Sequence, residues 1–242
     1  MKFSTRDARN LYFWLSDEFI SRHSESDFGS LCSIHVVRSN NISIHHVSIL
    51  GDFDTPNNDG IDIDSSNNTS IYSCNIDTGD DAICPKTNDG PVHNLTVSRC
   101  WIRTKSCGVK LGSASTSDFY GLRFNWINIT ESHRGIGLQL RDSGNIYDVI
   151  FSNFNIMTRY YDQSWWGRAE PIYVTSCPRS PATVVGSIYN LQRFTNYTGG
   201  LLDYRPGCQG LVDHQNSEIA PATIPESIEF VDFSLFYQTS LG

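Results

Sequence analysis

Two short acidic motifs stand close together in the sequence, NND at 57–59 and GDD at 79–81. They contribute the carboxylates of Asp59, Asp80 and Asp81 to a stretch that otherwise alternates Ile with polar residues, where Asp is disfavoured. Carboxylates held close together repel one another, so at least one pKa should rise. Two kinds of chemistry use such a group. In glycoside hydrolysis a carboxylic acid protonates the leaving oxygen while carboxylates activate water, and in Ca²⁺ sites carboxylates are ligands.

A repeat predicts the elements that position these carboxylates. Several segments share the form of NISIHHVSI, NTSIYSCNI and NLTVSRCWI, and their matching apolar positions recur every 26 or 27 residues. These positions are Ile44, Ile71, Val97, Phe124 and Phe151. Alternating apolar residues with Gly, Asn, Ser and Asp between them indicate short strands, and a fixed period of such strands indicates stacked coils. We therefore expect an all-β protein built as a β-solenoid, since the alternative sandwich would not require a constant period.

The repeat also sets a register for the acidic motifs. Equivalent residues of successive coils lie about one strand spacing apart, roughly 4.8 Å. One column of equivalent residues is then Asp59, Asp81, Cys107 and Arg134, and the column beside it is Asn58, Asp80, Ser106 and His133. Neighbouring side chains of a regular strand point to opposite faces. Asp80 and Asp81 can therefore share a cleft only at a bend or at the end of a strand.

Composition limits the choice of partner. The chain has 242 residues, of which 39% are hydrophobic and 18% charged, with a formal net charge of −8. This acidic balance argues against nucleic acid, and a polyanionic substrate would need a local basic site. No apolar run is long enough to cross a bilayer, and the N-terminus lacks the apolar core of a secretory signal. We expect a monomer with no nucleic-acid or membrane partner.

Two sets of aligned residues leave alternatives open. Cys74 and Cys100 fall in register and can form either a disulfide or an inward ladder of thiols. Since the chain has seven cysteines without a CxxC zinc spacing, at least one thiol has no partner within the chain. Asn41, Asn68 and Asn94 also align. Each begins an N-x-S/T sequon, but we favour a ladder of stacked amides over glycosylation.

The period fails near both ends, which suggests the domain organisation. Residues 1–31 contain ARNLYFWLSDEFI and are expected to form an N-terminal cap, as a short amphipathic helix, or to be the remnant of a longer N-terminal part. Residues 32–242 are expected to form a single solenoid domain. A long loop at about 157–187, rich in aromatic residues, interrupts it, and such loops often carry function.

The acidic motifs resemble those of a known family. NNDGIDIDSSNN and CNIDTGDDAIC resemble the NTDGID and GDD motifs of family 28 glycoside hydrolases, the polygalacturonases and their relatives. The resemblance implies a right-handed parallel β-helix of the pectin-lyase-like kind and an inverting hydrolysis without cofactor or metal. It makes Asp80 the general acid, with Asp59 and Asp81 holding the attacking water. It also implies a secreted protein that acts on a cell-wall polysaccharide, with a pectin-like polymer as the candidate.

Several departures point to a divergent subgroup, which ESHRGIGLQLRD and YDQSWWGRAEPIYVT also resemble. Cys107 stands where the family has a catalytic-site His, and Gly137-Leu138-Gln139 stands where it has an Arg-Ile-Lys that grips the galacturonate carboxylate. Family members also carry more coils before the first motif, so we expect a shortened chain or a fragment. Lys110, Arg134 and Arg141 can supply positive charge from neighbouring columns.

Further residues are candidates for binding the sugar. Trp165 and Trp166 can stack on a sugar ring. Polar side chains of the cleft and the long loop can hydrogen-bond hydroxyls or a carboxylate, namely His133, Arg134, Arg141, Arg168 and Glu170. Two other functions remain open, since β-solenoids host all three: a non-catalytic glycan-binding solenoid, and a polysaccharide lyase that depends on Ca²⁺.

Overall fold

The computed structural model describes residues 33–161 and 169–178, the single residues 180, 183, 186 and 188, and the backbone of short segments at 2–3, 11–12, 20–21 and 228–238. Within these residues the strands lie parallel to their neighbours in two sheets, as coils stacked along one axis. This is the parallel β-solenoid that the repeat predicts. Among the described residues, no helix has the length and apolar character needed to span a bilayer.

The first sheet carries the acidic motifs at the start of its strands. It has seven strands, which follow one another at intervals of one coil. In spatial order they are β1 (Lys2–Phe3), β4 (Ile34–Val37), β7 (Ile61–Asp64), β10 (Ile83–Lys86), β13 (Cys107–Gly112), β15 (Arg134–Leu140) and β17 (Ile172–Ser176).

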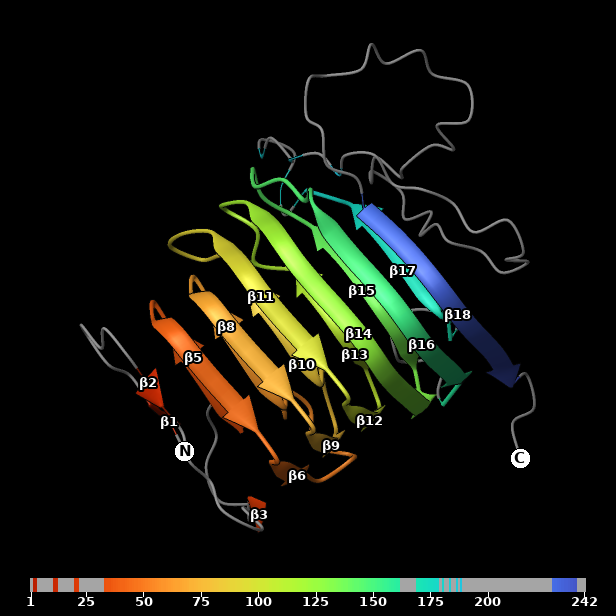
Figure 1. The fold of residues 1–242 in the computed structure, drawn as a ribbon. Coiled ribbons are helices and arrows are strands. Elements are labelled where there is room, and N and C mark those ends of the chain that lie inside the picture. The colour runs from red at the N-terminus through yellow and green to blue at the C-terminus, as the bar shows by residue number, and fades with distance from the viewer. Residues whose placement is uncertain are drawn as a thin grey trace, which may run out of the picture.

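The second sheet has eleven strands and bends around the other side of the core. One arm is β2 (Leu11–Tyr12), β5 (Asn40–His45), β8 (Asn67–Tyr72) and β11 (Val92–Ser98). The other is β3 (Ile20–Ser21), β6 (Ser48–Leu50), β9 (Asn75–Thr78) and β12 (Trp101–Thr104). The long strand β14 (Phe119–Ser132) pairs with both β11 and β12, and β16 (Val149–Arg159) and β18 (Ile228–Gln238) follow it in chain order (Figure 1).

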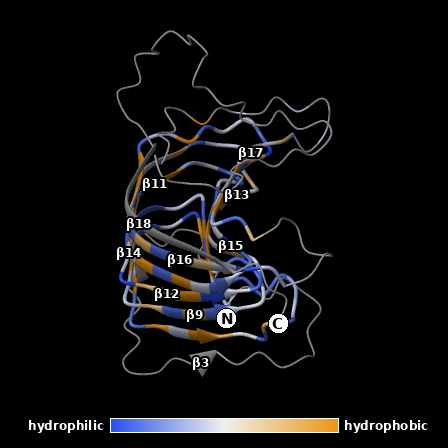
Figure 2. Cartoon of the chain, turned by 90° about the vertical axis from the view of Figure 1, so that its right-hand side faces the viewer, coloured by the Kyte–Doolittle hydropathy of each residue, from blue (hydrophilic) through white to orange (hydrophobic). Residues whose placement is uncertain are grey.

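Ladders of apolar residues from equivalent positions of successive coils fill the core. The repeat positions pair in register from Ile44 through Ile71, Val97 and Phe124 to Phe151, and all are at most 1% exposed. The Phe124 and Phe151 rings stack with centroids 4.9 Å apart. Figure 2 shows hydrophobic and hydrophilic residues alternating along the strands, because successive side chains point into the core and out of it.

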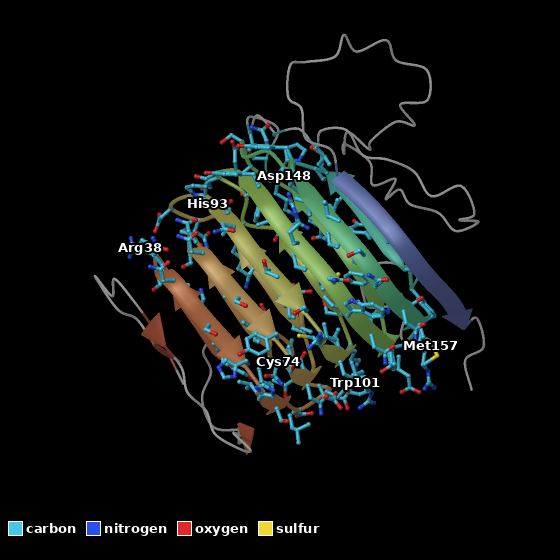
Figure 3. All side chains as sticks on the ribbon, in the orientation of Figure 1. Arg38, Cys74, His93, Trp101, Asp148 and Met157 are labelled. Carbon is cyan, nitrogen blue, oxygen red and sulfur yellow. The ribbon has the colours of Figure 1, made fainter. Side chains whose placement is uncertain are left out.

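A column of left-handed residues turns the chain into the second sheet. Asn41, Asn68, Asn94, Gly121 and Asp148 have φ values between 49° and 65°. Asn and Gly tolerate this conformation better than other residues do. The expected amide ladder is confirmed where Asn94 donates to the side chain of Asn68, while Asn68 donates to Asn40 rather than to Asn41. Asp148 marks this edge of the sheet in Figure 3.

The connections from the first sheet to the second lengthen along the solenoid. They comprise residues 65–66, 87–91, 113–118 and 141–148 in successive coils, and so grow from two residues to eight. We call this edge the variable corner. The strands that border this corner stay paired in register there, and the register shift between Ile129 and Ser132 lies at the other end of β14, so the change in length is confined to the connections.

The structure refines three expectations. Leu11–Tyr12 and Ile20–Ser21, within the segment expected to hold a helix, are strands that pair with β5 and β6. Within the loop expected at about 157–187, β17 pairs with β15, because IYVTS is buried and continues the sheet. Cys74 and Cys100 are both buried free thiols, so the ladder and not the disulfide is formed, whereas Cys177 is disulfide-bonded.

Candidate active site

The register that aligns the acidic motifs is confirmed. Ile61 pairs with Ile83, and Ile83 pairs with Val109. Cys107, two residues before Val109, pairs with Arg134. The predicted column therefore exists and consists of Asp59, Asp81, Cys107 and Arg134.

A second column, made of small residues, explains how the acidic side chains face outward. The residues that follow the acidic column are Gly60, Ala82, Gly108 and Gly135. A Cβ at Gly60 would lie 2.7 Å from Ile76 Cγ2, and one at Gly135 would lie 2.6 Å from Ile156 Cγ2. These positions point into the core and have no room for a large side chain. The preceding residue of each coil therefore projects outward at this bend, where Asp80 and Asp81 can share one site.

Asp81 is buried and fully hydrogen-bonded. Its Oδ1 accepts hydrogen bonds from Ser106 Oγ at 2.8 Å and from the backbone N–H of Cys107 at 3.3 Å, and its Oδ2 binds the ammonium of Lys110. Burial alone would raise the pKa of Asp81, but Lys110 and these donors outweigh it and hold the pKa below its usual value. Asp81 is therefore ionised.

Asp80 lies beside Asp81 but in a different environment. It is half-buried, and its oxygens accept hydrogen bonds from the backbone N–H groups of Asn57 at 2.9 Å and Asp81 at 2.8 Å. Burial, followed by repulsion from Asp81 and Asp59, raises its pKa to about 6. Asp80 is therefore protonated in mildly acidic solution while its neighbour is not.

Asp59 departs from the ionised state that the family resemblance implies. Its Oδ2 lies 2.9 Å from Lys86 Nζ, but Lys86 also binds Asp62 at 2.5 Å. Burial, with the charges of Asp62 and Asp81, outweighs the shared lysine and raises the pKa of Asp59 to about 7. Below about pH 6, where Asp80 is protonated as well, Asp81 is the ionised member of the predicted catalytic set, and Asp59 and Asp80 are protonated.

A cavity of about 190 Å³ opens beside Asp80 and Asp81. Of the residues proposed from the sequence, it brings together Asp80, Asp81, Lys110, His133, Arg134 and Arg141. Four further lining residues were not singled out as binding residues: Ser106, Cys107, Ser113 and Gln139. All of them occupy β13, β15 or the adjoining turns, in the coils that follow the acidic motifs.

Comparisons with known proteins identify the family of this chain. The sequence profile of glycosyl hydrolases family 28 matches residues 26–158, which are 133 of the 242 residues. This chain belongs to that family. Two similar proteins are a probable polygalacturonase of Vitis vinifera and an exopolygalacturonase of Arabidopsis thaliana, each 28% identical. The matches cover 52% and 49% of this chain, but only 28% and 29% of those proteins.

A solved polygalacturonase structure supports the fold. The polygalacturonase from Erwinia carotovora ssp. carotovora superimposes with a TM-score of 0.51 at 15% identity, over 86% of this chain and 52% of that one. The similarity confirms the β-solenoid architecture. The chain thus spans about half of this solved structure and less than a third of the two plant relatives.

The family's expected His position holds a neutral thiol here. Cys107 is 2% exposed, and its Sγ lies 3.2 Å from the Val109 carbonyl oxygen. Burial, together with the nearby charge of Asp81, raises the pKa of the Cys107 thiol. The residue therefore supplies a backbone N–H to Asp81 but no titrating side chain.

The family's first expected basic position is occupied by Gly137, and a lysine lies one coil earlier in the same column. Lys110 pairs in register with Gly137. A Cβ at Gly137 would lie 3.0 Å from Cys107 Sγ and 3.7 Å from Lys110 Cγ. The side chains of Cys107 and Lys110 thus fill the space above Gly137, and the positive charge of Lys110 is directed to Asp81.

Arg134 is held by two partners. Its Nε lies 3.2 Å from Glu170 Oε2, and its guanidinium carbon lies 3.8 Å from the centre of the buried Tyr173 ring. Its Nη2 is buried without a hydrogen-bond partner among the described residues. Glu170 is therefore a partner of Arg134 in the structure. The remaining predicted binding residues, Trp165, Trp166 and Arg168, lie outside the described residues.

Sequence reasoning missed Lys86, which binds Asp59 and Asp62. The register of the strands indicates this contact, because Lys86 pairs with Asp64 and Cys84 pairs with Asp62 on neighbouring strands. Alternate residues of β10 share one face, so a lysine two positions beyond Cys84 can reach back to the acidic column.

The cluster of Asp59, Asp81 and Cys84 does not suit Ca²⁺. Ligand atoms of Asp59, Asp81 and Cys84 lie within 4.8 Å of one another. Ca²⁺ takes six to eight oxygen ligands, whereas this group offers a thiol and two carboxylates that already bind Lys86 and Lys110. Burial raises the pKa of the Cys84 thiol as well. This part of the chain therefore lacks the ligand set that a lyase dependent on Ca²⁺ would need.

Proposed function

We propose that this protein is a glycosidase that hydrolyses a pectin-like cell-wall polysaccharide, with Asp80 as general acid and Asp81 as the ionised group that polarises the attacking water. Membership of family 28 and the names of the polygalacturonase relatives support the reaction and substrate class. A substrate of this kind is extracellular, so we propose that the protein acts outside the cell.

The observation that carries the proposal is the opposite protonation of two adjacent carboxyls. Asp80 lines the cavity with a pKa of about 6, and the pKa of Asp81 is lowered by Lys110 and its other hydrogen bonds. A pair whose environments separate the two pKa values is the arrangement that acid and base catalysis require. We propose that Asp59, bonded to Lys86, orients the water together with Asp81, and that the anomeric centre is inverted.

The first test is a reducing-sugar assay over a panel of pectic and other cell-wall polysaccharides. On a cleaved substrate, Asp80→Asn should lose about 10²–10⁴-fold in rate, because a general acid contributes in that range. The exposed pair of Asp89 with Arg38 provides a control: Asp89→Asn should keep the parent rate. An unchanged rate in Asp80→Asn would contradict the assignment of the acid.

A second assay separates the roles of the aspartates. An aryl glycoside with a good leaving group needs little protonation, so it should recover part of the lost rate in Asp80→Asn but not in Asp81→Asn. Asp59→Asn should behave like Asp81→Asn if it orients the water. Equal losses in all three variants on both types of substrate would contradict this division of roles.

One observation favours a non-catalytic alternative. Cys107 replaces the His that the family resemblance leads us to expect beside the aspartates, so the protein can be a glycan-binding solenoid without turnover. Saturable binding of an oligosaccharide by the parent protein, with no reducing ends released over many hours, would establish that alternative.

A further inference from the structure

We propose that the cavity beside Asp80 binds a sugar ring that carries no free carboxylate, either a neutral sugar or an esterified uronate. The inference rests on the proposed function for its general substrate class and names the ring that this site prefers. It follows from the way two cations that line the cavity, Lys110 and Arg134, are already paired within the chain.

Lys110 is bound to Asp81. The side chain of Lys110 is 17% exposed and that of Asp81 is 3% exposed, and the ammonium bonds to Asp81 Oδ2. A ligand carboxylate that approached Lys110 would also approach the buried carboxylate of Asp81. The repulsion between the two anions would offset the attraction, because both act at similar distances in a site of low dielectric constant.

Arg134 is paired in the same way. Its side chain is 7% exposed, its charge faces Glu170, and the ring of Tyr173 covers the guanidinium. It still offers one donor, since Nη2 has no hydrogen-bond partner among the described residues. A donor whose charge is already balanced suits a hydroxyl or an ester carbonyl oxygen, which accepts a hydrogen bond without bringing a second negative charge beside Glu170.

The other lining groups are consistent with a neutral ligand. Ser106, Ser113 and Gln139 are uncharged polar residues around the cavity. Gln139 can donate and accept hydrogen bonds, as the hydroxyls of a sugar require. The third cation of the cavity, Arg141, follows the last residue of β15, whereas Arg134 begins that strand.

Binding to Asp80→Asn tests the proposal without requiring turnover. Isothermal titration would compare three trisaccharides: trigalacturonate, its methyl ester, and a neutral galactotriose. We expect the ester or the neutral sugar to bind at least tenfold more tightly than the free acid at pH 7, and the better of the two identifies which source of neutral ring the site prefers. Tighter binding of the free acid would overturn the proposal.

Releasing Arg134 from Glu170 should weaken the preference against the free acid. In an Asp80→Asn background, Glu170→Gln should improve the affinity for the acid relative to the ester about tenfold, because the guanidinium then lacks its counter-charge. Glu131→Gln is the matched control, since Glu131 pairs with Arg103 and does not line the cavity. An unchanged ratio in a folded Glu170→Gln protein would overturn the proposal.

A double variant tests whether the effect of Glu170→Gln acts through Arg134. Adding Arg134→Gln to Glu170→Gln removes both charges, and the gain for the acid should disappear. If none of the three trisaccharides binds at millimolar concentration, the proposal is overturned. The proposed function would survive that result if the parent protein still releases reducing ends from a pectic polymer.

Discussion

Replacing Lys110 with methionine should lower the free energy of unfolding by about 3–5 kcal/mol at pH 7, the cost of breaking a buried ion pair. Methionine keeps most of the volume of the side chain, so the main loss is the charge that binds Asp81. Asp81 is 3% exposed and would remain as a buried charge with its bonds from Ser106 and Cys107. At an effective dielectric constant of 20, charges about 4 Å apart attract by about 4 kcal/mol, which agrees with this range.

The loss should depend on pH, and its sign can be derived. In the parent protein the pKa of Asp81 is lowered, so its contribution to stability is present above the ordinary Asp pKa and is lost as pH falls through the lowered value. Without Lys110, burial raises the pKa of Asp81, and ionisation then destabilises the fold as pH rises. The difference between the parent and Lys110→Met should therefore be large at pH 7 and smaller near pH 4.

Urea denaturation at several pH values, with the m-value monitored, measures both effects. Lys105→Met is the matched control, because Lys105 pairs with Asp54, whose side chain is 80% exposed, and such pairs contribute about 0–1 kcal/mol. The double variant Lys110→Met/Asp81→Asn should recover most of the stability. A loss in Lys110→Met that does not change with pH, or no recovery in the double variant, would refute the reasoning.

Three further predictions concern the titration of the site, the small-residue column beside it, and the left-handed column of the second sheet. Because the pKa of Asp59 is raised to about 7 and that of Asp80 to about 6, the free energy of unfolding should fall as the pH rises from about 4 to 7. In urea denaturation at several pH values Asp59→Asn should make this fall smaller, and an unchanged dependence on pH would contradict the assignment. Gly135→Ala should lower the free energy of unfolding by about 1–3 kcal/mol in thermal unfolding, because the added methyl group overpacks the core. Gly90→Ala should be nearly neutral, since its Cβ would make only an ordinary contact at 3.8 Å, and equal losses of stability in the two variants would argue against the small-residue column. Asn68→Ala should lower the free energy of unfolding by about 1–2 kcal/mol, because alanine is strained at the φ of 52° that this position has. Asn68→Gly should avoid the backbone strain but still lose the amide ladder, and identical unfolding curves for the two variants would show that the backbone conformation is not the cause.

Much of the fold could be predicted because the solenoid repeats one coil. The spacing of Ile44, Ile71 and Val97 identifies the core ladder, and the same period aligns Asp59 with Asp81. The strand β17 escaped prediction because it follows Arg134 after a longer interval: Ile136 pairs with Ile172, 36 residues later, whereas the repeat has 26 or 27. A fixed period does not reveal a coil that is 9 or 10 residues longer than the repeat.

The protonation of the site could not be predicted from residue types alone. Which carboxylate a lysine binds depends on side-chain direction, and Lys86 divides its charge between Asp59 and Asp62 while Lys110 binds Asp81. The sequence predicts repulsion among the aspartates, but it does not show which of them has the raised pKa. Burial and the two lysines decide that Asp59 takes up a proton more readily than Asp81.

The variable corner has a consequence for how such a protein can evolve. Its connections grow from residues 65–66 to residues 141–148 while the strands beside them stay in register. Closing a loop of eight residues instead of two costs only about 1.2 kcal/mol, at about 0.6 kcal/mol for each doubling. Insertions here can therefore reshape the rim around a ligand by small steps, while the columns that hold Asp59 and Asp81 stay fixed. Selection can act on specificity at this corner without risking the packing that keeps the carboxyls in place.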